Sequence, residues 1–214
     1  MHKGLIEFVE SCEFPTEIAN FHLYAFTENA TNKEHLAIAL GSFDPNVPTL
    51  ARIHCQCLTG ESLFSLRCDC RFQLTESLKK IAKKGCGVVF YLQQEGRNIG
   101  LLNKIKAYKL QDQGLDTVEA NHKLGFTDDP RDYKIVSAIA KYLGVNSVDL
   151  MTNNPRKITA LEENGLLINK RIPIKSKATK YNRDYLKTKA KKLGHLLYIL
   201  KIYFIYVILD NEQL

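Results

Sequence analysis

The alternation of apolar and polar positions along the chain predicts an α/β domain. The runs GCGVVFYL (85–92) and NSVDLM (146–151) are short, apolar and rich in β-branched residues, which is typical of buried strands. The segments FQLTESLKKIAKKG (72–85) and DYKIVSAIAKYLG (132–144) place apolar residues on one stripe and end in glycine, as amphipathic helices do. Strands that alternate with helices favour an α/β fold.

Two further helix starts are marked by capping residues. Asp116 followed by Glu119 has the form of a capping box, in which each side chain bonds the other residue's backbone N–H. Asn154 stands before Pro155, so a good N-cap residue precedes proline at the first helical position. No Pro/Gly/Ser-rich linker and no internal repeat divides the chain. We therefore expect a single domain.

The segment LLYILKIYFIYVIL (196–209) is apolar apart from Lys201. It is shorter than the roughly 20 residues that a membrane-spanning helix needs. A buried tail or a subunit contact is the favoured interpretation. An interfacial membrane anchor and a non-native or frayed extension are the alternatives.

Composition indicates a protein that folds around its own core inside the cell. Of the 214 residues, 45% are hydrophobic, which is enough for a sizeable core. Glu7 and Glu10 interrupt the first apolar stretch and no small-residue cleavage pattern follows, so we find no secretory signal. We expect a cytoplasmic protein, in which clustered cysteines are metal ligands or catalytic thiols rather than disulfides.

The net charge of +7 suggests an anionic partner. It is concentrated in residues 170–192, which hold ten Lys and Arg residues and one acid, Asp184. A solvated C-terminal face is one interpretation of this basic run. A binding patch for phosphate or nucleic acid is the other.

Four of the six cysteines form two C-x-C pairs, Cys55/Cys57 and Cys68/Cys70. Residues i and i+2 of a strand share a face, so each pair can direct both sulfur atoms toward one ion, and zinc is the metal that such spacing favours. Four thiolates would make a closed structural site. Three thiolates would leave a position for water, and the spacing alone leaves both possibilities open.

Three more segments could contact a nucleotide. QQEGRNIGLLNK (93–104) joins a strand to a helix through a glycine turn, where backbone N–H groups and the helix dipole suit a phosphate or purine. FTDDPRDY (126–133) surrounds Arg131 with carboxylates, and MTNNPRK (151–157) offers Thr152 and Lys157 to phosphates. A glycine turn without a ligand and a solvated loop with a helix cap are the structural alternatives.

In order and spacing, these segments resemble GTP cyclohydrolase II from about residue 51 to about residue 197. The likeness is carried by ARIHCQCLTGESLFSLRCDC, QQEGRNIGLLNKIKAYKLQDQGLDTVEAN, LGFTDDPRDY, MTNNPRKITALEENG and YLKTKAKKLGHLL. It implies a single domain with a mixed sheet flanked by helices, consisting of a β-rich lead-in (1–50), a catalytic core (51–197) and an apolar tail (198–214). It also implies the first step of riboflavin biosynthesis, in which the imidazole ring of GTP is opened to give formate, pyrophosphate and 2,5-diamino-6-(5-phosphoribosylamino)pyrimidin-4-one.

The resemblance also implies a metal and partners. Cys57, Cys68 and Cys70 would bind one zinc ion per subunit, and Mg²⁺ would accompany the triphosphate of the substrate. A homodimer is expected, with neither a nucleic acid nor a membrane as partner.

Roles in catalysis and substrate binding follow in the same way. Asp129 would accept a proton, and Tyr108 would lie near the reacting ring. Arg131 would be either a nucleophile toward the α-phosphate or a stabiliser of charge that develops there. Contacts to GTP would come from Arg52, Ile53, His54, Cys55, Gln56, Gln73, Glu95, Gly96, Arg97, Thr117, Thr152 and Lys157.

Four positions near the expected site depart from the family's pattern. Cys55, Gln56, Arg71 and Gln93 stand where the family has serine, glutamate, glycine and arginine. Two alternative functions therefore accompany the main hypothesis. One is a diverged paralogue that binds GTP with partial or no turnover, and the other is a zinc-stabilised nucleic-acid-binding protein that uses the basic run.

Overall fold

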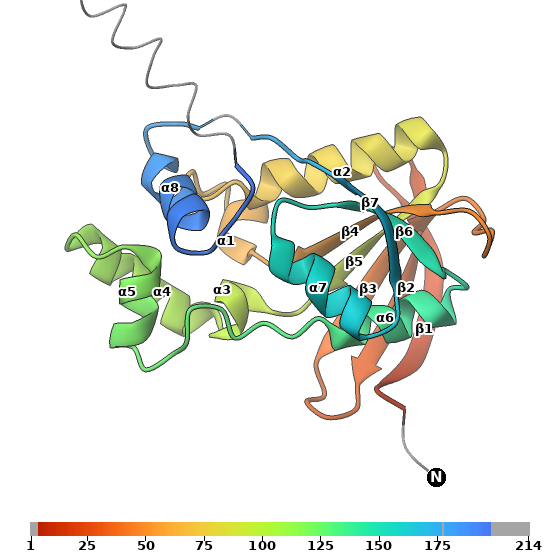
Figure 1. Cartoon of the computed structure of the whole chain (residues 1–214), viewed down its shortest axis with the longest axis horizontal. Coiled ribbons are helices and arrows are strands. Elements are labelled where there is room, and N and C mark those ends of the chain that lie inside the picture. The colour runs from red at the N-terminus through yellow and green to blue at the C-terminus, as the bar shows by residue number, and fades with distance from the viewer. Residues whose placement is uncertain (1–3, 177, 198–214) are drawn as a thin grey trace, which may run out of the picture.

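The computed structural model describes residues 4–176 and 178–197, and it confirms the predicted α/β fold with a sheet flanked by helices (Figure 1). The strands are β1 (Ile6–Pro15), β2 (Asn20–Glu28), β3 (Glu34–Leu40), β4 (Thr49–Cys55), β5 (Gly87–Leu92), β6 (Ser147–Met151) and β7 (Leu167–Ile172). The helices are α1 (Leu58–Glu61), α2 (Cys70–Lys84), α3 (Glu95–Asn98), α4 (Leu101–Asp112), α5 (Thr117–Lys123), α6 (Lys134–Tyr142), α7 (Pro155–Glu163) and α8 (Arg183–Lys191).

The seven strands form one mixed sheet in the order β1-β2-β3-β5-β4-β6-β7. The first three strands pair as an antiparallel meander, and β3 pairs antiparallel with β5. From β5 through β4 and β6 to β7, neighbouring strands are parallel. The carboxyl ends of β4, β5 and β6 therefore meet at one edge, where side chains from distant parts of the sequence come together.

Each face of the sheet has its own apolar core. Along β5, Val88 and Phe90 belong to the cluster that contains Ile139 of α6, whereas Val89 belongs to the cluster that contains Ile81 of α2. Both faces of β5 are thus buried, which explains why its sequence is a continuous apolar run rather than an alternating one.

The two long predicted helices end as their glycines indicate. Gly85 follows α2 with φ +78°, and Gly144 lies just beyond α6 with φ +74°, both in the left-handed region that favours glycine. The predicted strand 85–92 accordingly begins only at Gly87, because Gly85 ends the preceding helix.

The predicted caps are also confirmed. The Asp116 carboxylate accepts bonds from the N–H groups of Val118 (2.8 Å) and Glu119 (3.1 Å), while the Glu119 carboxylate accepts from the Asp116 N–H (2.9 Å). Asn154 accepts a bond from the N–H of Arg156 (3.0 Å) at the start of α7.

Four helices lie together at one end of the molecule rather than on the sheet. Figure 1 shows α3, α4, α5 and α8 grouped there, with α4 against α5 and α5 against α8. Among the helices of the described residues, none has the length and apolar character required to cross a bilayer. The predicted tail 198–214 lies outside the described residues, so the proposed buried or subunit-contact role stays a prediction.

The core under α6 gives a stability prediction. Ile139 is fully buried, so Ile139→Ala should lower the free energy of unfolding by about 2–5 kcal/mol, through lost apolar burial and the cavity left behind. The matched change Ile105→Ala, at a side chain that is 49% exposed on α4, should shift it by less than about 0.5 kcal/mol. Urea unfolding followed by circular dichroism measures both. Equal effects would contradict the burial of Ile139.

Candidate active site

The candidate site lies beyond the carboxyl ends of the three central parallel strands. Cys55 is the last residue of β4, Gln94 follows β5, and Thr152 follows β6. In α/β sheets this edge is where ligands bind, because loops from several strands converge there. The described helices α3, α4, α5 and α8 close the other side of the site (Figure 1).

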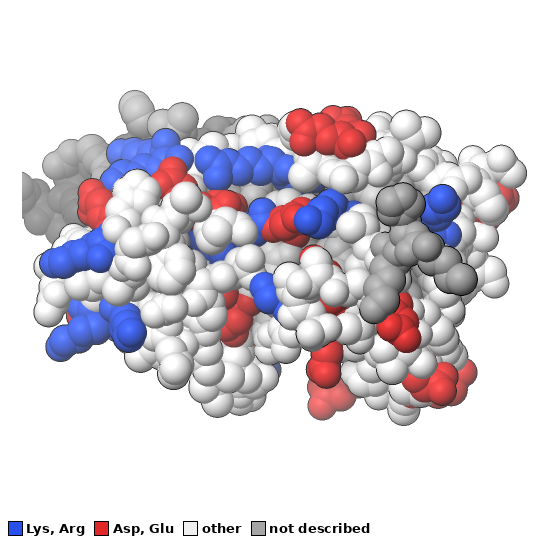
Figure 2. All heavy atoms as spheres, turned by 90° about the horizontal axis from the view of Figure 1, so that it is seen from below, with Lys and Arg blue, Asp and Glu red and all other residues white. Residues whose placement is uncertain are grey.

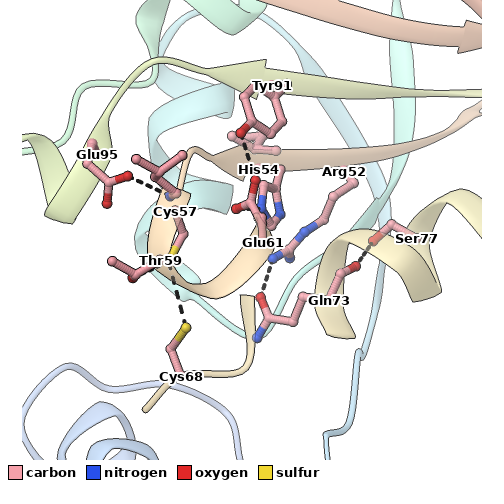
Figure 3. A network of polar contacts seen from close by, with 12 residues as sticks. Arg52, His54, Cys57, Thr59, Glu61, Cys68, Gln73, Ser77, Tyr91 and Glu95 are labelled. Carbon is pink, nitrogen blue, oxygen red and sulfur yellow. Dashed lines mark hydrogen bonds and ion pairs between the residues drawn. The ribbon is translucent and has the colours of Figure 1, made fainter. Parts of the chain in front are cut away.

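Three thiols form the one group of ligand side chains in the described residues that could hold a metal ion. The sulfur atoms of Cys57, Cys68 and Cys70 all lie within 4.8 Å of one another, and those of Cys57 and Cys68 are 3.7 Å apart (Figure 3). Two sulfurs bound to zinc at about 2.3 Å in tetrahedral geometry are about 3.8 Å apart. The cluster therefore has the spacing and the donor atoms of a zinc site.

The prediction that each C-x-C pair lies on a strand is wrong. Cys55 ends β4, but Cys57 precedes the short helix α1 and Cys70 is the first residue of α2. A turn and a helix start replace the strand geometry, and Cys55 is not a member of the thiol cluster. Its thiol instead lines the adjoining cavities.

Gly60 makes room for the sulfur atoms. A Cβ atom at this position would lie 2.5 Å from the Cys68 sulfur and 3.1 Å from the Cys57 sulfur, so any side chain larger than hydrogen would displace them. The absence of a side chain at Gly60 thus leaves the space that the sulfur atoms of the cluster occupy.

The thiols of the cluster share protons in a way that suits metal binding. Hydrogen bonds from Cys68 and Cys70 lower the pKa of the Cys57 thiol, and the hydrogen bond with Cys57, together with burial, raises the pKa of Cys68 to about 11. The Lys104 ammonium lies 3.1 Å from the Cys57 sulfur and 2.7 Å from a Glu95 carboxylate oxygen. Because adjacent negative charges repel, the three sulfurs favour a single thiolate. That thiolate is at Cys57, beside the Lys104 ammonium.

A buried polar network holds the segment that carries Cys57. His54 at the end of β4 and Tyr91 of β5 bond the two carboxylate oxygens of Glu61, at 2.8 and 2.7 Å (Figure 3). The Glu95 carboxylate accepts a bond from the N–H of Leu58 at 2.6 Å. These bonds fix α1 against the strand ends and so fix the position of the first ligand.

A first cavity borders the thiol cluster. The predicted residues that line it are Cys55, Gln56, Glu95, Gly96, Arg97, Tyr108, Thr117 and Arg131, together with the three cluster cysteines. Two amides on its wall have unpaired buried atoms, the side-chain oxygen of Gln94 and the side-chain nitrogen of Asn121. Gln94 donates its amide N–H to the Asp132 carbonyl (2.6 Å), which leaves its oxygen available as an acceptor.

A second cavity shares a wall with the first. Both are lined by Cys55, Cys70, Arg97, Arg131 and Tyr185. Its cations are Arg52, Arg97, Arg131, Lys157 and Lys189, and within the described residues no Asp or Glu lines it. This cavity is therefore built for a ligand with several negative charges.

The cations of the second cavity are held in place by hydrogen bonds. The Arg52 guanidinium donates to the Met151 carbonyl (2.8 Å) and to Gln73 (2.5 Å), as Figure 3 shows for the Gln73 contact. The Lys157 ammonium donates to the Ile53 carbonyl (2.8 Å). Such bonds orient the positive groups before any ligand arrives.

Arg131 and Asp129 form a bidentate ion pair with both N–O distances at 2.6 Å. Burial opposes the charge of Arg131, but Tyr133 and Asp129 more than offset it, so the pKa of Arg131 is raised well above its usual range. Arg131 is therefore a permanent cation at the junction of the two cavities. Asp129 lies behind it and is not part of either cavity wall.

Two sequence predictions need correction in detail. The Ile53 side chain is fully buried in the core under α6 and its carbonyl is taken by Lys157, so neither faces a cavity. The segment EGRN is not a regular helix start, because Gly96, Arg97 and Asn98 all have φ between 61° and 74°. This left-handed turn directs Arg97 to the cavities in place of a helix N-terminus.

Several lining residues were not predicted as site residues. They are Arg67, Gln94, Lys104, Asn121, Asn153, Tyr185, Lys189 and His195. The last three lie in the YLKTKAKKLGHLL segment, whose local sequence does not show which of its basic residues is buried. Position in the cavity required tertiary structure.

Four residues of the basic run form ion pairs within the chain. Ion pairs join Lys170 to Asp149, Lys187 to Asp184, Lys189 to Asp69, and Lys192 to Asp116 and Glu119. Figure 2 shows Lys and Arg side chains gathered toward the end that carries α4, α5 and α8, with acidic side chains among them. Lys177 lies outside the described residues.

Comparison with known proteins agrees with this geometry. Residues 7–173 match the protein family described as GTP cyclohydrolase II. The chain is 53% identical over 192 residues to a GTP cyclohydrolase-2 of Azotobacter vinelandii, covering 90% of this chain and 92% of that protein. It is 54% identical over 193 residues to a GTP cyclohydrolase-2 of Tolumonas auensis, covering 90% and 98%. It is 50% identical over 193 residues to a riboflavin biosynthesis protein of Vibrio vulnificus, covering 90% of this chain and 53% of that one.

The close contact between Gly60 and the sulfur atoms gives a metal-binding prediction. Gly60→Ala should weaken zinc affinity by about tenfold or more, because the new methyl group would push the Cys57 and Cys68 sulfurs out of place. Gly4→Ala is the matched control, since its nearest contact would be 3.7 Å away. Competition with a zinc chelator, with circular dichroism as a check of folding, measures the effect. Wild-type zinc affinity in a folded Gly60→Ala variant would contradict it.

Proposed function

This chain belongs to the GTP cyclohydrolase II family and is a hydrolase; on that basis we propose that it opens the imidazole ring of GTP, releasing formate and pyrophosphate, in riboflavin biosynthesis. The observation that carries the proposal is the shared wall between a three-thiol cluster and a cavity lined by five cations. A purine nucleoside triphosphate needs both features, one at its base and the other at its phosphates.

The thiol cluster fits a single zinc ion. Its donors are three sulfurs at tetrahedral spacing, and Gly60 leaves room for them. Cys55 lies outside the cluster, which supports three protein ligands rather than four. A zinc ion with three protein ligands supplies Lewis-acid chemistry, by activating water for hydrolysis.

The first cavity would hold the guanine base. The unpaired oxygen of Gln94 can accept a bond from a ring N–H, and the unpaired amide N–H of Asn121 can donate to a carbonyl oxygen. Guanine offers one group of each kind on adjacent positions of its ring. A buried amide that lacks a partner is costly, so a base that satisfies both atoms would be preferred over one that does not.

Tyr108 would act near the reacting ring as a proton donor rather than as a base. Its hydroxyl lies 3.2 Å from the Thr59 hydroxyl, and Arg67 stacks on its ring at 4.9 Å. Burial is the largest effect on the Tyr108 hydroxyl and raises its pKa. The hydroxyl therefore keeps its proton at neutral pH.

Arg131 would stabilise charge on the α-phosphate. Its bidentate pair with Asp129 and its raised pKa both favour the guanidinium form, which can donate hydrogen bonds but cannot attack phosphorus. This supports charge stabilisation over nucleophilic attack. Asp129 would hold Arg131 in place and balance part of its charge.

Mg²⁺ is proposed to travel with the triphosphate rather than to occupy a site of its own. Within the described residues the second cavity has no carboxylate on its wall, so phosphate oxygens and water would be the ligands of Mg²⁺. A homodimer in the cytoplasm is proposed from the family alone.

Two of the four departures from the family's pattern, Arg71 and Gln93, line neither of the two cavities. Arg71 sits in α2 and stacks on Phe64 at 4.1 Å, and Gln93 accepts a bond from the N–H of Glu34, on the side of β3. Cys55 replaces one small polar group with another. Gln56 alone removes a carboxylate from the wall of the first cavity, so it is the residue on which the diverged-paralogue alternative depends.

A turnover assay tests the proposal. The zinc-loaded chain with GTP and Mg²⁺ should release formate and pyrophosphate in equal amounts, and Arg131→Ala should lower kcat by about 100-fold or more, the scale of losing a charge stabiliser. Pyrophosphate without formate would favour the diverged paralogue, and Gln56→Glu would then be expected to restore formate release. Absence of nucleotide chemistry, with salt-sensitive binding to nucleic acid, would favour the third hypothesis.

Lys157 gives the site a pH dependence. Burial lowers the pKa of Lys157 to about 7, where Cys55 opposes the shift and Arg52 and Arg131 add to it. Below pH 7 Lys157 is therefore a cation that attracts phosphate, and as pH rises through 7 the unliganded protein loses this charge.

The affinity for GTP should accordingly fall as pH rises from about 6.5 to about 8.5, with the protein taking up a proton on binding at the higher pH. Lys157→Met should bind GTP more weakly at pH 6.5, and its GTP affinity should no longer show the fall with pH that Lys157 causes. Titration of the phosphates themselves would remain in this variant, so the two contributions can be separated. Isothermal titration calorimetry in buffers of different ionisation enthalpy measures both. An unchanged pH profile in Lys157→Met would refute the assignment.

A further inference from the structure

The second cavity is completed by a segment far along the chain, residues 178–197. Tyr185 and Lys189 of α8, and His195 just beyond it, line this cavity together with residues of β4, of α7 and of the turn that follows β6. Lys189 and His195 line only this cavity, whereas Arg131 lines both. They therefore belong to the wall of the second cavity alone.

Hydrogen bonds fix this segment at Lys189 and at His195. The Lys189 ammonium donates to the buried carboxylate of Asp69 (2.7 Å), and the N–H of His195 donates to the Lys189 carbonyl (3.0 Å). The next residue, Leu196, donates its N–H to the carbonyl of Asn153 (2.8 Å). Asp69 lies between the cluster residues Cys68 and Cys70, and Asn153 lies in the turn that follows β6.

The Lys189 ammonium can still donate hydrogen bonds to a ligand. Its side chain is 10% exposed, and the ammonium lies 4.4 Å from the centre of the Tyr185 ring. An ammonium carries three donor protons, and the contact with Asp69 uses one. Lys189 thus presents its remaining donor protons on the cavity wall, with an orientation that the contact with Asp69 sets before a ligand binds.

His195 faces a group of cations. Burial, followed by the positive charges of Lys189, Arg131, Lys157 and Arg97, lowers its pKa to about 2. The imidazole is therefore neutral in the free protein and has one N–H that can donate a hydrogen bond. Such an arrangement is stabilised by an anion that shares the space.

Arg97 adds two buried donor groups without a partner to the wall of the cavity. Both terminal guanidinium nitrogens of Arg97 are buried and find no hydrogen-bond partner among the described residues. A buried guanidinium without an acceptor is costly, and phosphate oxygens are the acceptors that its planar fork fits best.

Resting on the proposed function, we propose that Lys189 and His195 are further substrate-binding residues, which contact the phosphate groups of GTP beyond the α-phosphate. The α-phosphate is placed by Arg131 at the junction of the cavities. The β- and γ-phosphates then extend into the second cavity, toward the wall that residues 178–197 supply.

The experiment compares GTP with GMP, which keeps the base and the α-phosphate but lacks the outer phosphates. In the full-length, zinc-loaded chain, Lys189→Met and His195→Gln should each weaken GTP binding by about tenfold, the effect of losing one charge-assisted hydrogen bond. Binding of GMP should change by less than about twofold on the same scale. Isothermal titration calorimetry gives both affinities.

Lys187→Met is the matched control. It removes the same charge from the same helix, but Lys187 pairs with the exposed Asp184 and lines neither cavity. GTP and GMP affinities should both stay at the wild-type value. A loss equal to that of Lys189→Met would mean that net charge, rather than contact, is responsible, and would overturn the proposal.

Zinc content is measured on every variant, because Lys189→Met leaves the buried Asp69 without its cation. If that variant loses zinc, the GTP and GMP affinities of His195→Gln test the proposal instead. The His195 side chain makes no hydrogen bond within the described residues, so this substitution leaves no partner unpaired. Equal weakening of GTP and GMP, or no weakening of GTP, overturns the proposal. Formate release by the wild-type chain is scored separately, so failure of the proposed function is distinguished from failure of this assignment.

Discussion

The site depends on one buried carboxylate, that of Asp69. It accepts hydrogen bonds from Lys189 (2.7 Å), Gln73 (2.6 Å) and Ser176 (3.0 Å), and Gln73 in turn holds the Arg52 guanidinium. Burial acts against the charged form of Asp69, but these partners more than offset it and lower its pKa. Because a buried charge costs several kcal/mol when it is unpaired, the loop of cysteine ligands, α2 and α8 must all be in place together.

Features set by short-range interactions could be predicted from the sequence. The glycines at 85 and 144, the capping box at Asp116 and the cap at Asn154 involve residues within a few positions of one another, so the pattern alone identifies them. The thiol cluster was recognised from its cysteines, but its geometry was not. Strand β4 ends at Cys55, two residues before Cys57, so the C-x-C rule does not apply at Cys57, and nothing in the local sequence marks that end.

Features set by long-range contacts could not be predicted in the same way. Lys189 and Asp69 are 120 residues apart, and the basic run around Lys189 gave no sign of which of its charges would be buried. The turn at residues 96–98 is a second case. Its consecutive left-handed residues include the non-glycine Arg97 and Asn98, a conformation that costs energy locally and persists only where surrounding contacts enforce it. Asn98 has such contacts, with Lys33 and with the Pro130 carbonyl.

The wide separation of Asp69 from Lys189 bears on how the protein is made. A ribosome extends a chain at roughly 5–20 residues per second, so the loop with the cysteine ligands emerges several seconds or more before α8 exists. All three cysteines of the thiol cluster therefore exist on the nascent chain before Lys189 has been added to it. Until α8 has been made, the Asp69 carboxylate has no ammonium to pair with, so its burial must follow the synthesis of the last described helix.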